Sequence, residues 1–122
     1  MKNQLYMEEL RPLMDSLREE YQEGDIIYIY YGAKAAFKYY QSDFGFADQD
    51  FIIGVASRGN QENYLEDIRL LKGNERIWFV FSHVYKVEDE FFLESLDSMG
   101  VRRKHFDEYG ADLYLYDLSQ DG

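Results

Sequence analysis

Residues 25–40 read DIIYIYYGAKAAFKYY. A run of β-branched and aromatic residues, 26–31, passes through Gly32 into a segment whose apolar residues recur with helical spacing, at Ala33, Ala36, Phe37, Tyr40 and Phe44. The first run is apolar on both of its alternating faces, as expected for a central strand that helices cover on both sides. The stretch therefore predicts one strand-to-helix step of an α/β domain.

The same step recurs along the chain. Further strands are predicted at 51–56 and at 77–83, where the sequence reads IWFVFSH. Helical spacing predicts three more helices with the apolar positions Leu13, Leu17 and Tyr21 after Pro12, then Tyr64, Ile68 and Leu71 after the N-cap Asn60, then Phe92, Leu96 and Met99. Gly24, Gly73 and Gly100 follow three of these helices, where a left-handed residue is favoured.

Residues 101–119, VRRKHFDEYGADLYLYDLS, predict two strands joined by a turn at 109–111. Leu113, Leu115 and Asp117 would alternate with Tyr114, Tyr116 and Leu118. The complete fold prediction is an α/β, three-layer αβα Rossmann-like sandwich. Its mostly parallel five-stranded sheet has the order 2-1-3-5-4, with the C-terminal hairpin strands antiparallel to the rest.

Length and composition predict one domain over residues 1–122, with an extended arm at 1–10. The 13 Lys+Arg against 24 Asp+Glu give a net charge of −11, which disfavours nucleic acid partners. The basic run 102–105 is interpreted as a solvated strand end. The absence of cysteine excludes disulfides and thiolate zinc sites, and no apolar run has the roughly 20 residues of a membrane span.

Ligands of open α/β sheets bind beyond the carboxyl ends of the strands. The candidate ligand-binding residues at that edge are Tyr31, Lys34, Tyr39, Ser57, Arg58, Ser82, His83 and Tyr85. Tyr31 and Tyr39 are predicted to offer an aromatic surface for a sugar ring, whereas Tyr28 and Tyr30 are predicted to lie in the core with hydroxyls bonded at its margin.

No catalytic residue, metal ligand or cofactor is predicted. YYGAKAA lacks the glycine-rich turn of a dinucleotide site. Ser82 and His83 are neighbours on a predicted strand, so their side chains would point to opposite faces and could not act as nucleophile and base. Asp48 and Asp50 are interpreted as shaping the loop before the second strand.

Three segments indicate a family: RPLMDSLREEYQEGDIIYIYYGAKAAFKYY (11–40), GNERIWFVFSHVY (73–85) and GADLYLYDLS (110–119). In order and spacing, the region from Arg11 to Ser119 resembles the soluble C-terminal region of bacterial membrane glycosyltransferases. These enzymes are related to dolichyl-phosphate-mannose protein mannosyltransferases and aminoarabinose transferases. The resemblance implies that a polyprenyl-phosphate sugar donor is used by acidic residues of a membrane-embedded portion, so this chain is not expected to be catalytic by itself.

The preferred hypothesis is a noncatalytic accessory domain excised from the C-terminus of such a transferase. It would lie on the extracytoplasmic face of the cytoplasmic membrane, contact the membrane-embedded portion and assist recognition of an acceptor glycan. The alternative is a stand-alone cytosolic α/β protein that binds, or is a small enzyme for, an unknown small ligand, with Met1 as the native start. A third hypothesis is dimerisation through the hairpin residues Tyr114 and Tyr116.

Overall fold

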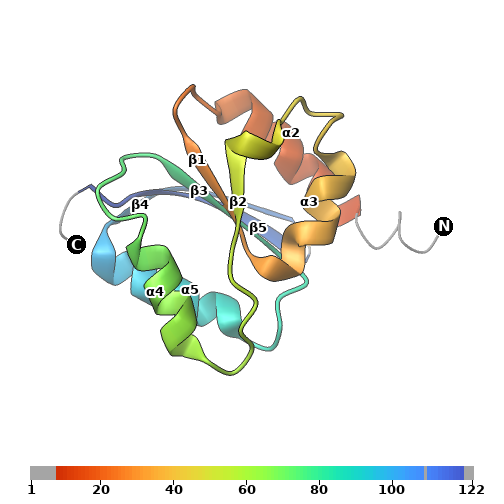
Figure 1. Ribbon diagram of the computed structural model, residues 1–122. Coiled ribbons are helices and arrows are strands. Elements are labelled where there is room, and N and C mark those ends of the chain that lie inside the picture. The colour runs from red at the N-terminus through yellow and green to blue at the C-terminus, as the bar shows by residue number, and fades with distance from the viewer. Residues whose placement is uncertain (1–7, 109, 120–122) are drawn as a thin grey trace.

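The computed structural model describes residues 8–108 and 110–119, and one open five-stranded sheet forms its centre (Figure 1). The strands are β1 (Ile26–Ile29), β2 (Phe51–Ile53), β3 (Ile77–Ser82), β4 (Val101–Glu108) and β5 (Ala111–Asp117). They lie in the order β2-β1-β3-β5-β4, which confirms the predicted order.

The strand directions differ from the prediction. β1 is parallel to β2 and to β3, whereas β5 is antiparallel to β3 and to β4. The sheet is therefore mixed, and the prediction of a mostly parallel sheet is wrong. The two strands of a hairpin run in opposite directions, so only β5 is reversed and β4 runs the same way as β1, β2 and β3.

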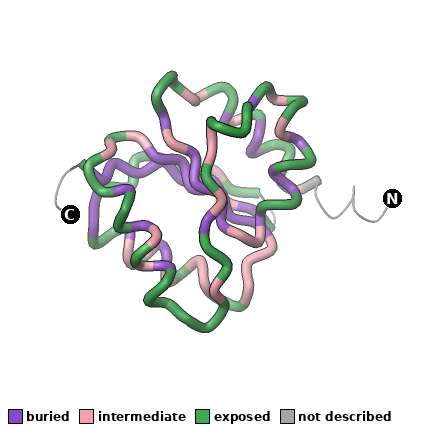
Figure 2. Tube along the Cα trace, in the orientation of Figure 1, coloured by how far each residue is buried: buried purple, intermediate pink, exposed green. Residues whose placement is uncertain are grey.

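Helices cover both faces of the sheet (Figure 1). The helices α2 (Arg11–Glu20) and α3 (Lys34–Tyr40) pack on one face, and α4 (Gln61–Arg69) and α5 (Glu88–Met99) pack on the other. Three short 3-10 turns accompany them, η1 (Glu8–Leu10), η2 (Tyr31–Ala33) and η3 (Asp48–Asp50). Buried residues gather along the central strands, while each helix buries one side and exposes the other (Figure 2).

The alternation of β3 divides the core. Trp78 and Val80 pack towards α2 and α3, whereas Ile77, Phe79 and Phe81 pack towards α4 and α5. β5 alternates as predicted, with Leu113 and Leu115 in the first cluster and Tyr114, Tyr116 and Leu118 in the second. Aromatic side chains therefore fill mainly the α4–α5 side, where Tyr28 of β1 and the following Tyr30 are also buried.

Several local predictions are corrected. Glu8–Leu10 form a 3-10 turn rather than an extended arm, because Leu10 is fully buried, and residues 1–7 of the predicted arm lie outside the described residues. Gly24 and Gly73 have the expected positive φ, but Gly100 is extended with φ −167°. A Cβ at Gly100 would lie 2.1 Å from the backbone oxygen of Asp117, so this glycine permits close packing instead of a left-handed turn.

The edge strand β4 carries the basic run 102–105, and each of these side chains is paired within the chain. The pairs are Arg102 with Asp97, Arg103 with Asp117, Lys104 with Glu20 and His105 with Asp112. A register shift between Arg102 and Lys104 also bends the strand. Tyr114 and Tyr116 are 5% and 0% exposed, so the predicted dimer contact through these two side chains is wrong.

Candidate functional site

The carboxyl ends of β1 and β3 are adjacent at the point where the chain reverses its direction across the sheet. From β1 the chain passes through α3 to β2 on one side, and from β2 it passes through α4 to β3 on the other side of β1. Such a switch point leaves an opening between the flanking loops and is where open α/β sheets bind ligands. The residues that follow β1 and β3 therefore define the candidate site.

A partly buried cluster of phenols surrounds one carboxylate at this point. Glu88, in the first turn of α5, accepts a hydrogen bond at Oε1 from the Tyr30 hydroxyl at 2.5 Å and from the Tyr31 hydroxyl at 3.2 Å. Its Oε2 accepts one from the Tyr64 hydroxyl of α4 at 2.9 Å. We call Tyr30, Tyr31, Tyr64 and Glu88 the tyrosine–glutamate cluster. It connects Tyr30, directly after β1, with η2, α4 and α5 at one point.

Two phenols of the cluster, Tyr30 and Tyr64, are held in the protonated form. Burial, followed by the hydrogen bond to Glu88, raises the pKa of Tyr30 and of Tyr64 well above that of a free phenol. The Tyr30 oxygen also accepts a hydrogen bond from the backbone N–H of Tyr85 at 3.0 Å. Tyr30 therefore fixes the loop that follows β3 to the end of β1, and both buried phenols act as neutral hydrogen-bond donors.

A cationic layer lies outside the cluster. The Arg58 Nε donates a hydrogen bond to the Tyr31 oxygen at 2.8 Å, and the guanidinium carbon lies 4.3 Å from the centre of the Tyr85 ring. This hydrogen bond raises the pKa of Arg58 above its usual value, so the guanidinium remains charged. The Lys86 Nζ lies 5.5 Å from the same Tyr85 ring. Arg58 and Lys86 are exposed, so the aromatic ring carries two cations at the protein surface.

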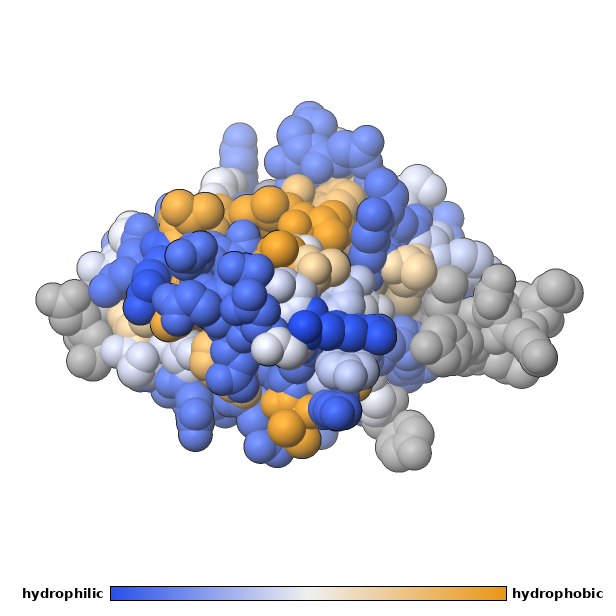
Figure 3. All heavy atoms as spheres, turned by 60° about the horizontal axis from the view of Figure 1, so that its bottom comes forward, coloured by the Kyte–Doolittle hydropathy of each residue, from blue (hydrophilic) through white to orange (hydrophobic). Residues whose placement is uncertain are grey.

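A surface pocket of about 360 Å³ adjoins this layer. Its lining combines the start of α4 with the loop before α5, namely Gly59, Gln61, Tyr85, Lys86, Val87 and Glu88. Figure 3 shows the lower face of Figure 1, where hydrophilic side chains dominate and apolar ones gather in separate patches. The pocket is lined by an aromatic ring, one cation, an amide and one carboxylate, and Arg58 lies against the Tyr85 ring that forms part of this lining.

Of the eight candidate ligand-binding residues predicted from the sequence, four lie at this site and four do not. Tyr31, Arg58 and Tyr85 come together as described, and the neighbouring Ser57 accepts a hydrogen bond from Asn63 of α4 at 2.8 Å. The other four residues, Lys34, Tyr39, Ser82 and His83, lie elsewhere.

Lys34 and Tyr39 belong to α3, which packs on the opposite face of the sheet from Tyr31. The predicted Tyr31–Tyr39 surface is therefore absent among the described residues. Tyr39 is 47% exposed and packs edge-on against Tyr40 at 5.0 Å. The Tyr31 ring lies parallel to Tyr64 at 6.3 Å and beneath Arg58, so it is not an open stacking platform.

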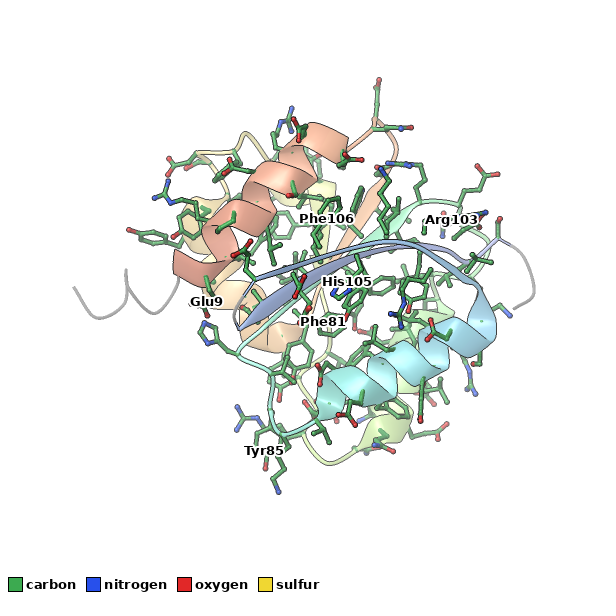
Figure 4. All side chains as sticks on the ribbon, turned by 180° about the vertical axis from the view of Figure 1, so that it is seen from behind. Glu9, Phe81, Tyr85, Arg103, His105 and Phe106 are labelled. Carbon is green, nitrogen blue, oxygen red and sulfur yellow. The ribbon has the colours of Figure 1, made fainter. Side chains whose placement is uncertain are left out.

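Ser82 and His83 are also outside the cluster. Ser82 is fully buried, whereas the His83 Nε2 lies 3.4 Å from the Glu9 Oε2 of η1. Figure 4 shows Glu9 near the start of α2, at some distance from Tyr85. His83 has φ +52°, so the extended strand ends before it and simple alternation no longer predicts its direction.

Three members of the cluster were not predicted as site residues. Tyr30 and Tyr64 were assigned to the core, and the prediction that Tyr28 and Tyr30 bond their hydroxyls at its margin is confirmed by Asp67 and Glu88. Glu88 gave no motif, because acids are common in the first turn of a helix. A useful signal would have been the number of tyrosines that required a partner, since buried phenols seldom lack one.

Asp48 and Asp50 make hydrogen bonds around the loop before β2. Asp50 accepts a hydrogen bond from the Ala47 backbone N–H at 2.8 Å, and Asp48 accepts one from Gln41 at 2.7 Å, so both shape the loop before β2. Within residues 8–108 and 110–119, no group of three or more His, Asp or Glu side chains could hold a metal ion. No helix of that same part of the chain has the length and apolar character to cross a membrane.

Comparison of the chain with protein-family models, with curated proteins and with solved structures finds no match.

Proposed function

We propose that this chain is a noncatalytic accessory domain of a membrane glycosyltransferase that uses a polyprenyl-phosphate sugar, and that its strand-end site helps to recognise the acceptor glycan. The domain would act on the extracytoplasmic face of the bacterial cytoplasmic membrane, in contact with the membrane-embedded portion of the same protein. The family part of the proposal rests on the resemblance of residues 11–40, 73–85 and 110–119 to this group of transferases.

The observation that supports a binding role is the contact between the exposed Arg58 and the half-buried Tyr85 beside the pocket. Tyr31 holds the guanidinium in place through Nε, and Tyr30 holds the backbone of Tyr85. Side chains that are held in one geometry lose little entropy when a ligand binds. An aromatic ring, an amide and charged groups around one pocket suit a hydroxyl-rich ring with a polar and an apolar side.

The same site lacks the groups of a glycosidic catalyst. Enzymes that break or form glycosidic bonds with protein carboxylates typically place two of them across the substrate. Among the described residues that line the pocket, Glu88 is the one acid, and its two oxygens already accept three phenol hydrogen bonds. This supports a domain that binds rather than one that catalyses.

The alternative is a stand-alone cytosolic protein that binds or transforms a small ligand. It is supported by the position of the pocket near the switch point, which is where independent α/β proteins bind their ligands. The proposal extends to the fold, which we assign to the three-layer Rossmann-like class. The assignment rests on helices covering both faces of a sheet with the order β2-β1-β3-β5-β4.

Fractionation of the source cells, followed by an immunoblot with an antibody against this domain, separates the two candidates. The transferase proposal requires a membrane-bound band several times larger than 14.6 kDa. A band of 14.6 kDa in the aqueous fraction would refute it and support the alternative. In the full-length protein, Arg58→Ala should reduce transfer to the acceptor, whereas Arg69→Ala, which removes an exposed arginine of α4, should not.

A further inference from the structure

We infer that the ligand of the strand-end site carries an anionic group, a carboxylate or a phosphate on a saccharide, and that the outer edge of the Arg58 guanidinium binds it. The saccharide part of this inference rests on the proposed function. The anionic part rests on the geometry of Arg58, Tyr85 and Lys86 and can be tested separately.

The first argument is the orientation of the guanidinium. Its Nε is used by Tyr31 at 2.8 Å, and one of its faces is covered by the Tyr85 ring at 4.3 Å. For Arg58, the described residues provide no hydrogen bond to the two terminal nitrogens. Paired N–H groups on these nitrogens match the two oxygens of a carboxylate or phosphate. Arg58 therefore presents its best anion-binding edge away from the protein.

The second argument is that, within the part of the chain that the structure describes, no carboxylate pairs with Arg58. Arg69, Arg76, Arg102 and Arg103 each lie within 4.0 Å of a carboxylate. Arg58 has no such partner among the residues that the structure describes, although the chain contains 24 Asp and Glu residues. Arg11 and Arg18 lie over aromatic rings, as Arg58 does, but neither is next to the pocket. An arginine held in place without a carboxylate is available to a charged ligand, whereas the paired arginines would first have to release their partners.

The third argument is the local balance of charge. The chain as a whole has a net charge of −11 and would repel anions. Next to the pocket, Arg58 and Lys86 both lie over the Tyr85 ring, and the two oxygens of Glu88 are occupied by three phenol donors. Tyr31 connects the two charges, since it accepts from Arg58 and donates to Glu88. Of these three charged residues, the two exposed ones are cations, whereas Glu88 is partly buried.

The aromatic arrangement argues against a neutral sugar as the preferred ligand. A neutral sugar ring packs its apolar C–H face on an open aromatic face. Here Arg58 covers one face of Tyr85, and Tyr31 is covered by Tyr64 and Arg58. The surface offered to a ligand is consequently a charged guanidinium supported by a ring.

The test is a titration of the chain by amide NMR or calorimetry with four probes: glucuronic acid, glucose 1-phosphate, glucose and inorganic phosphate. At least one of the two acidic sugars should bind about tenfold more tightly than glucose, because a hydrogen bond to a charged group contributes about 1.5–3 kcal/mol. Changes in the spectrum should centre on Arg58 and Tyr85. Raising the salt from about 50 to about 200 mM should weaken this binding.

Variants separate guanidinium geometry from charge alone. Arg58→Gln should abolish the preference for the acidic sugar, and Arg58→Lys should retain only part of it, because lysine keeps the charge but loses the paired donors. Arg69→Gln is the control, since it removes the same charge from an exposed position at the end of α4, away from the pocket lining, and should leave binding unchanged. Arg58 is itself exposed, so these variants should remain folded.

The outcomes are distinguishable. A preference for glucuronic acid identifies a carboxylate ligand, and a preference for glucose 1-phosphate identifies a phosphate ligand. If glucose binds as well as the acidic sugars, if Arg58→Gln has no effect, or if none of the probes binds, the anionic inference is overturned. If inorganic phosphate binds as tightly as glucose 1-phosphate, the saccharide part is overturned. A 14.6 kDa band in the aqueous fraction refutes the transferase proposal without changing the result for the anion.

Discussion

Replacement of Glu88 by alanine should destabilise the protein far more than an ordinary surface substitution does. The change leaves the hydroxyls of Tyr30 and Tyr64 without their acceptor, and these residues are 1% and 0% exposed. A buried polar group without a partner costs about 1–3 kcal/mol, so the two phenols together cost roughly 2–6 kcal/mol. Tyr31 is half-buried and can turn to water, so it adds little.

This loss is large beside the total stability of a typical domain, which is about 5–15 kcal/mol. The matched control is Glu90→Ala, since Glu90 is an exposed acid in the same first turn of α5. Its loss removes only a favourable charge at a helix N-terminus, which contributes about 0.3–1 kcal/mol. Glu88→Gln should fall between the two, because its amide retains one acceptor oxygen for three phenol donors.

The assay is equilibrium unfolding in urea, followed by the fluorescence of Trp78. This residue is the single tryptophan of the chain and is fully buried, so its emission reports on the core directly. Free energies of unfolding are obtained by linear extrapolation, with an unchanged slope as the check on two-state behaviour. If Glu88→Ala and Glu90→Ala lower the free energy of unfolding to within about 1 kcal/mol of each other, the tyrosine–glutamate cluster does not hold the site together.

Three further predictions concern stability. Burial raises the pKa of Tyr114 to about 12. The stability that this phenol contributes is therefore fully present below about pH 10 and is lost as the pH rises towards 12, by no more than about 1.4 kcal/mol per pH unit. In urea unfolding, Tyr114→Phe should reduce this loss of stability at high pH. Gly32→Ala should cost about 1–3 kcal/mol, because its Cβ would lie 2.7 Å from the His83 carbonyl oxygen, and an unchanged urea midpoint would contradict this. Asp25→Ala should lower the free energy of unfolding by roughly 2–4 kcal/mol and change the emission of Trp78, because it removes the acceptor 2.9 Å from the indole nitrogen. Unchanged emission and stability would show that this hydrogen bond does not stabilise the protein.

Much of the architecture was determined by the sequence itself. The hydrophobic periodicity identified five strands and the helices between them, and the short connections limited the strand order to the one observed. Left-handed backbone was correctly predicted at Gly24 and Gly73 because that conformation depends on local geometry. Gly100 was predicted for the wrong reason, since its need for glycine comes from Asp117, a residue 17 positions later.

The site was decided by the tertiary structure. Tyr31 and Tyr39 share one segment of sequence but lie on opposite faces of the sheet, because the chain turns through η2 between them. Tyr30, Tyr64 and Glu88 come from three separate elements and meet only when α4 and α5 pack on the same face of β1. Local pattern determines which residues are buried, but which buried phenols share one carboxylate depends on three-dimensional packing, because no regularity of the sequence links positions so far apart.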